Sequence, residues 1–116
     1  MRKHNSTNSI NQDHLNSNCD ISFTLSQIGG RWKINILCYL MNEQKLRFNE
    51  LKKRLSGISE RMLLLRLKEL ENDQLITKDV QLTTPPKVEY ELTPRAHSLK
   101  EIFILMEQWG EQNKIT

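Results

Sequence analysis

The stretch from Arg47 to Ile76, RFNELKKRLSGISERMLLLRLKELENDQLI, decides the fold. Apolar residues recur every three or four positions on both sides of a break at Ser56-Gly57-Ile58, and this pattern predicts two helices. Gly57 can adopt the positive φ that ends a helix, and the hydroxyl of Ser59 can cap the helix that follows. Two helices joined by so short a turn predict a helix-turn-helix.

The second of these helices has two different faces. At about 100° per residue, Leu63, Leu67 and Leu70 share one side, which we expect to face the core. Cations and aliphatic groups on the opposite side suit the DNA major groove, where they can reach phosphates, guanine and thymine methyl groups. The alternative is that the outer leucines pack against another helix while the cations are solvated. The outer residues are Arg61, Leu64, Leu65 and Lys68.

The net charge of +3 is unevenly distributed along the chain. Between Arg31 and Lys68, ten lysines and arginines stand against three glutamates, which gives +7 and leaves −4 for the remaining residues. A basic segment centred on a helix-turn-helix indicates a polyanionic partner such as double-stranded DNA.

Length and composition predict one domain without a membrane span. The 116 residues suffice for one modest core, and no run of about 18 apolar residues is present. Residues 1–18 are rich in Asn and Ser, which predicts a disordered tail before a domain at 19–112. The start lacks the apolar segment of a signal peptide, and two cysteines suggest no disulfide framework, so we expect a cytoplasmic protein.

Two helices are expected before the helix-turn-helix. The first begins at Asp20, with Ile21, Leu25 and Ile28 on one stripe, and Gly29-Gly30 ends it. The second runs from about Arg31 to Met41 and is apolar nearly all round, which is typical of a central core helix. Cys38 within it is interpreted as an inert core thiol, and residues 42–45 as a polar turn.

A β-hairpin is expected directly after the recognition helix. Alternating apolar residues predict strands from Ile76 to Leu82 and from Val88 to Leu92, joined by a proline-containing loop. A hairpin in this position is a wing, and a cation near its tip, Lys87, can contact the minor groove or its phosphates. The alternative is a plain edge of the core.

The last helix is expected to start with Thr93 as its N-cap and Pro94 at its first position. Its apolar stripe is wide enough to need a second subunit as part of its cover. The residues of this stripe expected at a dimer interface are Leu99, Ile102, Phe103, Met106 and Trp109.

With these residues in place, the sequence resembles the HxlR-type winged-helix transcriptional regulators of bacteria and archaea from Cys19 to about Gly110. Three phrases support the resemblance when taken in order: Ile28 to Lys33, IGGRWK; Arg47 to Leu51, RFNEL, with Gly57 to Met62, GISERM; and Pro85 to Tyr90, PPKVEY. The resemblance implies a mainly α fold with a small β-hairpin wing (α+β), a homodimer built by the first and last helices, and no catalysis. It thereby adds Ile21 and Leu25 of the first helix to the expected dimer interface. The residues expected to contact DNA are Arg47, Asn49, Lys52, Ser59, Arg61, Leu64, Leu65, Lys68 and Lys87.

The resemblance also implies a candidate sensor, because many family members have a cysteine just before the first helix and in some it responds to oxidants or electrophiles. Cys19 occupies this position, where a helix N-terminus favours the thiolate. Asp20 stands where proline is frequent in the family, and its negative charge works against a thiolate. Ala96 stands where glycine is usual, a difference that a helix tolerates.

Other functional classes find less support in the sequence. Its glycines match no nucleotide-binding spacing, and no nucleophile with a base or set of metal ligands is visible, so we expect no enzyme, cofactor or metal. A winged helix used for protein interaction is the second hypothesis, and it predicts an apolar or acidic recognition surface. The excess of cations from Lys45 to Lys68 argues against it and favours binding to DNA. For a two-fold homodimer, we expect the DNA site to be an inverted-repeat operator.

Overall fold

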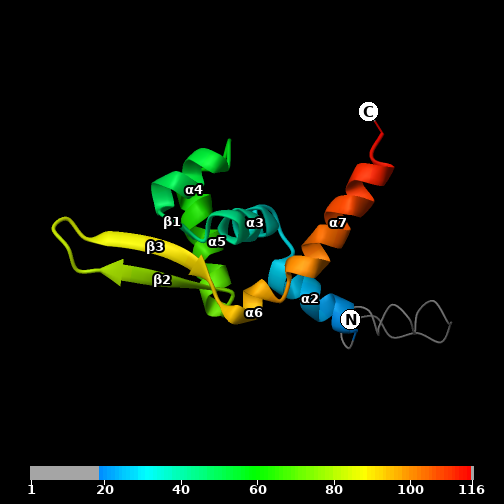
Figure 1. Cartoon of the computed structure of the whole chain (residues 1–116), viewed down its shortest axis with the longest axis horizontal. Helices are drawn as coiled ribbons and strands as arrows, with labels where there is room; N and C mark the ends of the chain where they lie inside the picture. Colours follow the sequence, from blue (N-terminus) through cyan, green and yellow to red (C-terminus); the bar gives the residue numbers. More distant parts are fainter. Residues whose placement is uncertain (1–18, 116) are drawn as a thin grey trace. The chain divides into compact units, whose positions relative to one another are not determined.

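The computed structural model describes residues 19–115 (Figure 1). The predicted disordered tail, 1–18, lies outside the described residues. The described residues fall into two units, which divide between Arg31 and Trp32. The first contains α2 (Asp20–Ile28), in agreement with the helix predicted from Asp20. Ile28 is buried, whereas Ile21 and Leu25 are exposed.

The second unit combines helices with a small antiparallel sheet, as the sequence predicts. Within residues 19–115, no helix has the length and apolar character needed to cross a membrane. Its elements are α3 (Lys33–Glu43), β1 (Lys45–Leu46), α4 (Phe48–Arg54), α5 (Glu60–Asn72), β2 (Ile76–Gln81), β3 (Lys87–Leu92), α6 (Pro94–His97) and α7 (Lys100–Asn113).

The core of this unit forms around α3. Ile36, Leu37 and Leu40 are fully buried, which confirms that α3 is a central core helix. The helix starts two residues later than predicted, because Trp32 adopts a left-handed conformation with a φ of 83°. From the other elements the core receives Leu46, Leu51, Leu55, Ile58, Leu63, Leu67, Leu70, Leu75, Ile76, Tyr90, Leu92, Ala96 and Phe103.

The helix-turn-helix forms from α4 and α5, as predicted. Gly57 in the turn has a φ of +92°. The hydroxyl of Ser59 accepts a hydrogen bond from the Met62 N–H at 3.0 Å and so caps α5. Leu63, Leu67 and Leu70 are completely buried, which confirms the predicted core face of the second helix.

The sheet has three strands, one more than the sequence predicts. Residues 45 and 46 form β1, so part of the predicted polar turn 42–45 is wrong: Lys45 pairs with Glu91 on β3. The strand order is β1-β3-β2, and both pairings are antiparallel. Two residues are too few to show the alternation by which a strand is recognised in a sequence. In the structure, Leu46 is buried and Lys45 is exposed, so Leu46 lies on the core side of the strand.

The predicted last helix is in fact two helices. The Thr93 hydroxyl accepts a hydrogen bond from the Ala96 N–H at 3.2 Å, and Pro94 is the first residue of α6, so the predicted start is confirmed. The chain then turns, because the Leu99 N–H bonds to the Ala96 carbonyl three residues back rather than four. The longer helix, α7, begins only at Lys100.

Candidate nucleic-acid interface

The outward face of α5 is built as the sequence predicts. Arg61 and Lys68 are exposed, and Leu64 and Leu65 are 44% and 47% exposed. Within the described residues, neither cation forms an ion pair. The face therefore offers two uncommitted positive charges and two aliphatic side chains on a helix whose other side is locked into the core.

The start of α4 supplies a second group of candidate contacts. Arg47 is the N-cap residue and is exposed, and its backbone N–H donates a hydrogen bond to Glu50 Oε1 at 2.8 Å. Asn49, Lys52 and Lys53 line a shallow, open depression on the same helix. Backbone phosphates are the natural partners of cations and amides placed in this way.

Several cations of the basic segment are engaged within the protein. Arg54 donates through Nε and Nη2 to the two carboxylate oxygens of Glu43, each at 2.5 Å. This bidentate hydrogen bonding lowers the pKa of Glu43 and raises that of Arg54. Both groups lie at the surface, so the pair orients α3 and α4 while contributing modestly to stability.

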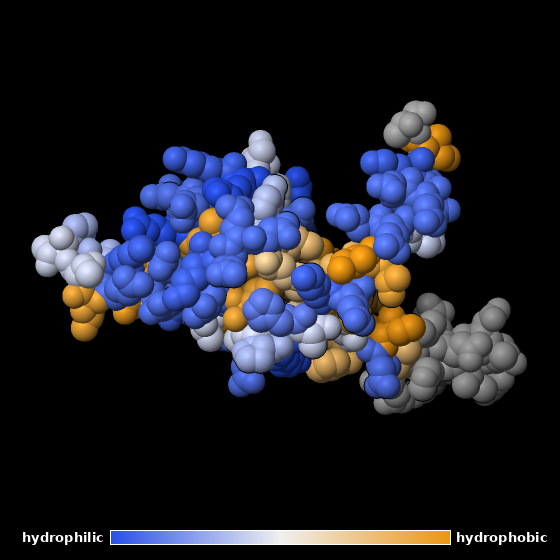
Figure 2. Space-filling model, in the orientation of Figure 1, coloured by the Kyte–Doolittle hydropathy of each residue, from blue (hydrophilic) through white to orange (hydrophobic). Residues whose placement is uncertain are grey.

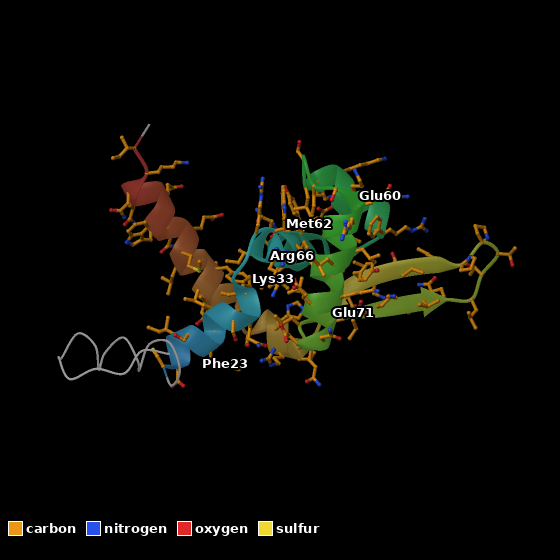
Figure 3. The ribbon with its side chains drawn as sticks, turned by 180° about the vertical axis from the view of Figure 1, so that it is seen from behind. Phe23, Lys33, Glu60, Met62, Arg66 and Glu71 are labelled. Carbon is orange, nitrogen blue, oxygen red and sulfur yellow. The ribbon has the colours of Figure 1, made fainter. Side chains whose placement is uncertain are left out.

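The most unexpected cation is Lys33, which is only 7% exposed. Its Nζ lies 3.9 Å from Glu69 Oε1, and Arg66 Nη1 donates to the same oxygen at 2.7 Å. Figure 3 shows Lys33 and Arg66 near one another, one from α3 and the other from α5. Neither is available to DNA as a free charge, and no short-range spacing in the sequence signals a pair separated by 36 residues.

Lys87 lies next to the tip of the wing, as predicted, in the last strand pair before the loop, opposite Gln81. Lys87 is the first residue of β3, is about one-third exposed, and its Nζ lies 3.8 Å from Glu89 Oε2. Lys45 of β1 donates to Asp79 Oδ2 at 3.0 Å, and this hydrogen bond lowers the pKa of Asp79 and raises that of Lys45. The charges on this face of the hairpin are thus largely paired with one another.

The two cysteines lie in different surroundings. Cys19 is the N-cap residue of α2, is partly exposed, and makes no side-chain capping bond. Cys38 is partly rather than fully buried and lines a pocket of about 150 Å³ between α3 and α7, with Phe103 and Glu107. Burial, and secondly the charge of Glu107, raise the pKa of the Cys38 thiol, in keeping with the inert role expected for it.

The terminal helices present apolar side chains to solvent. On α7, Ile102, Met106 and Trp109 of the predicted interface are exposed, and Leu99 before it is intermediate. Phe103 differs, because at 7% exposure it is already covered within the chain. Two further exposed residues were not among those predicted for the interface. Leu105 lies beside Ile102 and Trp109 by helical spacing, whereas Phe23 on α2 lies off the predicted stripe of that helix.

These elements define a class of protein. A capped recognition helix with an exposed basic and aliphatic face, followed at once by a β-hairpin, is the arrangement of winged helix-turn-helix DNA-binding proteins. Among residues 19–115, no group of His, Cys, Asp or Glu is placed to hold a metal ion.

The chain belongs to the HxlR-like helix-turn-helix family, which matches residues 27–116. It is 46% identical over 96 residues to the transcriptional regulator YybR of Bacillus subtilis, covering 83% of this chain and 76% of YybR. It is also 46% identical over 95 residues to the regulatory protein MalR of Fusobacterium mortiferum, covering 82% and 90%. Among solved structures it resembles the redox regulator HypR in its oxidized form, with a TM-score of 0.78, 41% identity, and coverage of 84% of this chain and all of HypR. The family and these relatives are regulators rather than enzymes, so this chain is a DNA-binding transcriptional regulator.

Proposed function

We propose that this regulator binds an inverted-repeat operator as a homodimer, each copy placing α5 in a major groove. The observation that supports this most is the α5 face, where Arg61 and Lys68 form no ion pair with any of residues 19–115 while the opposite leucines are buried in the core. Arg61, in the first turn of α5, would read a base edge, and Leu64 and Leu65 would meet thymine methyl groups. Arg47, Asn49, Lys52 and Ser59 would hold the phosphates.

The homodimer accounts for the apolar surface of the terminal helices. Taken separately, α2 exposes Ile21, Phe23 and Leu25, and α7 exposes Trp109 to 68% and Leu105 to 64%. Single exposed apolar residues are ordinary, but a run of them along one helix marks a surface that another chain covers. A two-fold dimer would set two α5 helices about 34 Å apart, one turn of DNA.

The test of this function is a gel-shift titration against salt, using duplexes selected from a randomised library by the protein itself. We expect Arg61→Ala to weaken binding to the selected sequences by about 1–3 kcal/mol and to relax the base preference at one position of the DNA site. Lys52→Ala should weaken binding to all sequences about equally. It should also reduce the salt slope, the slope of log affinity against log salt concentration, by about one. A protein that enriches no sequence and binds without salt dependence would favour the protein-interaction module instead.

We further propose that Cys19 makes DNA binding responsive to oxidants. Its position at the N-cap of α2, without a side-chain capping bond, and the likeness to the redox regulator HypR support this role. In a dimer, two Cys19 thiols could form an intersubunit disulfide, with diamide taking up the two electrons and two protons as its azo bond becomes a hydrazine. A disulfide at a dimerisation helix would rotate one recognition helix against the other.

The experiment compares the wild type with Cys19→Ser, each titrated with operator DNA before and after diamide. We expect the affinity of the wild type to change and that of Cys19→Ser to stay constant. Cys38→Ser is the matched control, and it should respond as the wild type does. Equal responses in the wild type and Cys19→Ser would remove Cys19 from the mechanism.

A further inference from the structure

The wing, the hairpin of β2 and β3, has an apolar face that leads from the core to its tip. Alternate residues of a strand share a face, so Lys78 and Val80 lie on the same side as buried Ile76. Their cross-strand neighbours continue the pattern, because Lys78 pairs with Tyr90 and Val80 with Val88. Leu82 follows β2 directly, at the centre of a tight turn in which the Thr83 N–H donates to the Gln81 carbonyl at 2.9 Å. We call Val80 and Val88, together with Leu82 at the adjoining tip, the wing ridge. Its two valines extend the side of the sheet on which Ile76, Tyr90 and Leu92 are buried, the side that packs on the helices, including α5.

The opposite face of the wing is charged and nearly neutralised by its own pairs. Lys45 binds Asp79 at 3.0 Å, and Lys87 lies 3.8 Å from Glu89. Glu91 adds a further acid on this face, opposite Thr77. Three carboxylates against two ammonium groups leave this surface negative, so it has little attraction for a polyanion.

The tip itself contains no cation. Residues 82–86 read LTTPP, and the Thr83 hydroxyl donates to the Pro85 carbonyl at 2.6 Å. Leu82 is 93% exposed, one of the most exposed large apolar side chains among residues 19–115. Figure 2 shows hydrophobic atoms at the end of the hairpin farthest from the helices. An aliphatic side chain presented at the end of a projecting arm has no role in the core.

We propose that the wing ridge, rather than the charged face, enters the minor groove of the bound DNA, with Leu82 as an apolar wedge at a base step. This rests on the proposed function, since a duplex held against α5 lies on the ridge side of the sheet. Minor-groove proteins insert leucine, proline and similar side chains between base steps, partly unstacking and bending the duplex. Lys78, an exposed cation on the ridge side, would pair with a flanking phosphate.

The experiment uses a duplex selected by the wild-type protein, with dyes at its two ends to report bending by energy transfer. We expect Leu82→Ala to weaken binding about tenfold, the order expected for losing a buried leucine side chain. The salt slope should stay unchanged, because no phosphate contact is lost. The bend should also decrease, whereas Leu82→Met, which keeps the bulk, should retain both affinity and bend.

Two matched lysine variants separate the two faces of the wing. Lys78→Ala on the ridge side should reduce the salt slope by about one, and Lys87→Ala on the charged face should leave it unchanged. The reverse result would restore Lys87 as the wing contact predicted from sequence. Undiminished affinity in Leu82→Ala, or a change in its oligomeric mass instead of its DNA affinity, would overturn the wedge. Failure of the wild type to select any DNA would refute the proposed function itself.

Discussion

Gly57 lies in the turn of the helix-turn-helix with a φ of +92°, a conformation that an L-residue with a Cβ rarely adopts. An added methyl group would meet nothing within 4 Å among the described atoms, so the requirement for glycine is conformational rather than steric. We expect Gly57→Ala to lower the free energy of unfolding by about 1–2 kcal/mol, measured by urea denaturation. Gly110→Ala is the control, since Gly110 lies inside α7 with open space around it, and there alanine should stabilise by about 0.5–1 kcal/mol. If the two substitutions changed the free energy of unfolding by the same amount in the same direction, glycine would have no conformational role at position 57.

Cys38 offers a pH-dependent prediction at the same scale. Burial and Glu107 raise the pKa of its thiol in the folded protein. The unfolded chain therefore loses this proton at lower pH than the folded one, and stability falls as pH rises above the thiol's ordinary pKa. In a Cys19→Ser background, we expect iodoacetamide to alkylate Cys38 more slowly in the folded protein than in urea, and Glu107→Gln to accelerate the folded reaction. If Glu107→Gln has no effect, the charge contributes nothing and access alone protects the thiol.

At the scale of elements, the link between α3 and the recognition helix is a buried cation. Lys33 is the first residue of α3, where the helix dipole disfavours a positive charge, and its ammonium group forms an ion pair with Glu69 of α5. Removing the partner of a buried charge costs about 3–5 kcal/mol, and the partial exposure of Glu69 reduces this to about 1–2 kcal/mol for Glu69→Gln. In a Lys33→Met background the same change should cost less, because no buried ammonium remains. Urea denaturation of the wild type, the two single variants and the double variant measures the coupling between Lys33 and Glu69. Strictly additive effects of the two substitutions would exclude this coupling.

The elements also show what sequence patterns can and cannot reveal. The helix-turn-helix was predictable because Leu63, Leu67 and Leu70 repeat at helical spacing, and because Ser59 marks the cap by local chemistry. The short strand β1 was not, since two residues make no pattern and its partner Glu91 is 46 positions away.

The candidate site divides in the same way. Helical spacing alone placed Arg61 and Lys68 on the outer face of α5. The pairing of Lys33 with Glu69 and of Lys87 with Glu89 depends on tertiary packing and strand conformation, and a count of charges along the chain treats all of these lysines as free.

At the scale of the whole molecule, the decisive question is how two copies associate. Helical spacing puts Ile102, Leu105, Met106 and Trp109 of α7 within one arc of about 100°, and all four are exposed. A charge placed in that arc would have to be buried without a partner if a second copy covers it. We therefore expect Leu105→Lys to shift the protein from dimer to monomer at micromolar concentration in sedimentation analysis. Operator binding should then become weak and steeply dependent on protein concentration, because the two half-sites no longer gain from a preformed pair.

Gln108→Lys is the matched control, since it adds the same charge to an exposed position of α7 outside the arc. It should remain a dimer with normal operator affinity, and thermal melts should show that neither variant is unfolded. A monomeric wild type with full affinity for an inverted repeat would contradict the dimer. If Leu105→Lys stays dimeric and Gln108→Lys does not, the interface lies on a different side of α7, and the two recognition helices must be spaced by another surface.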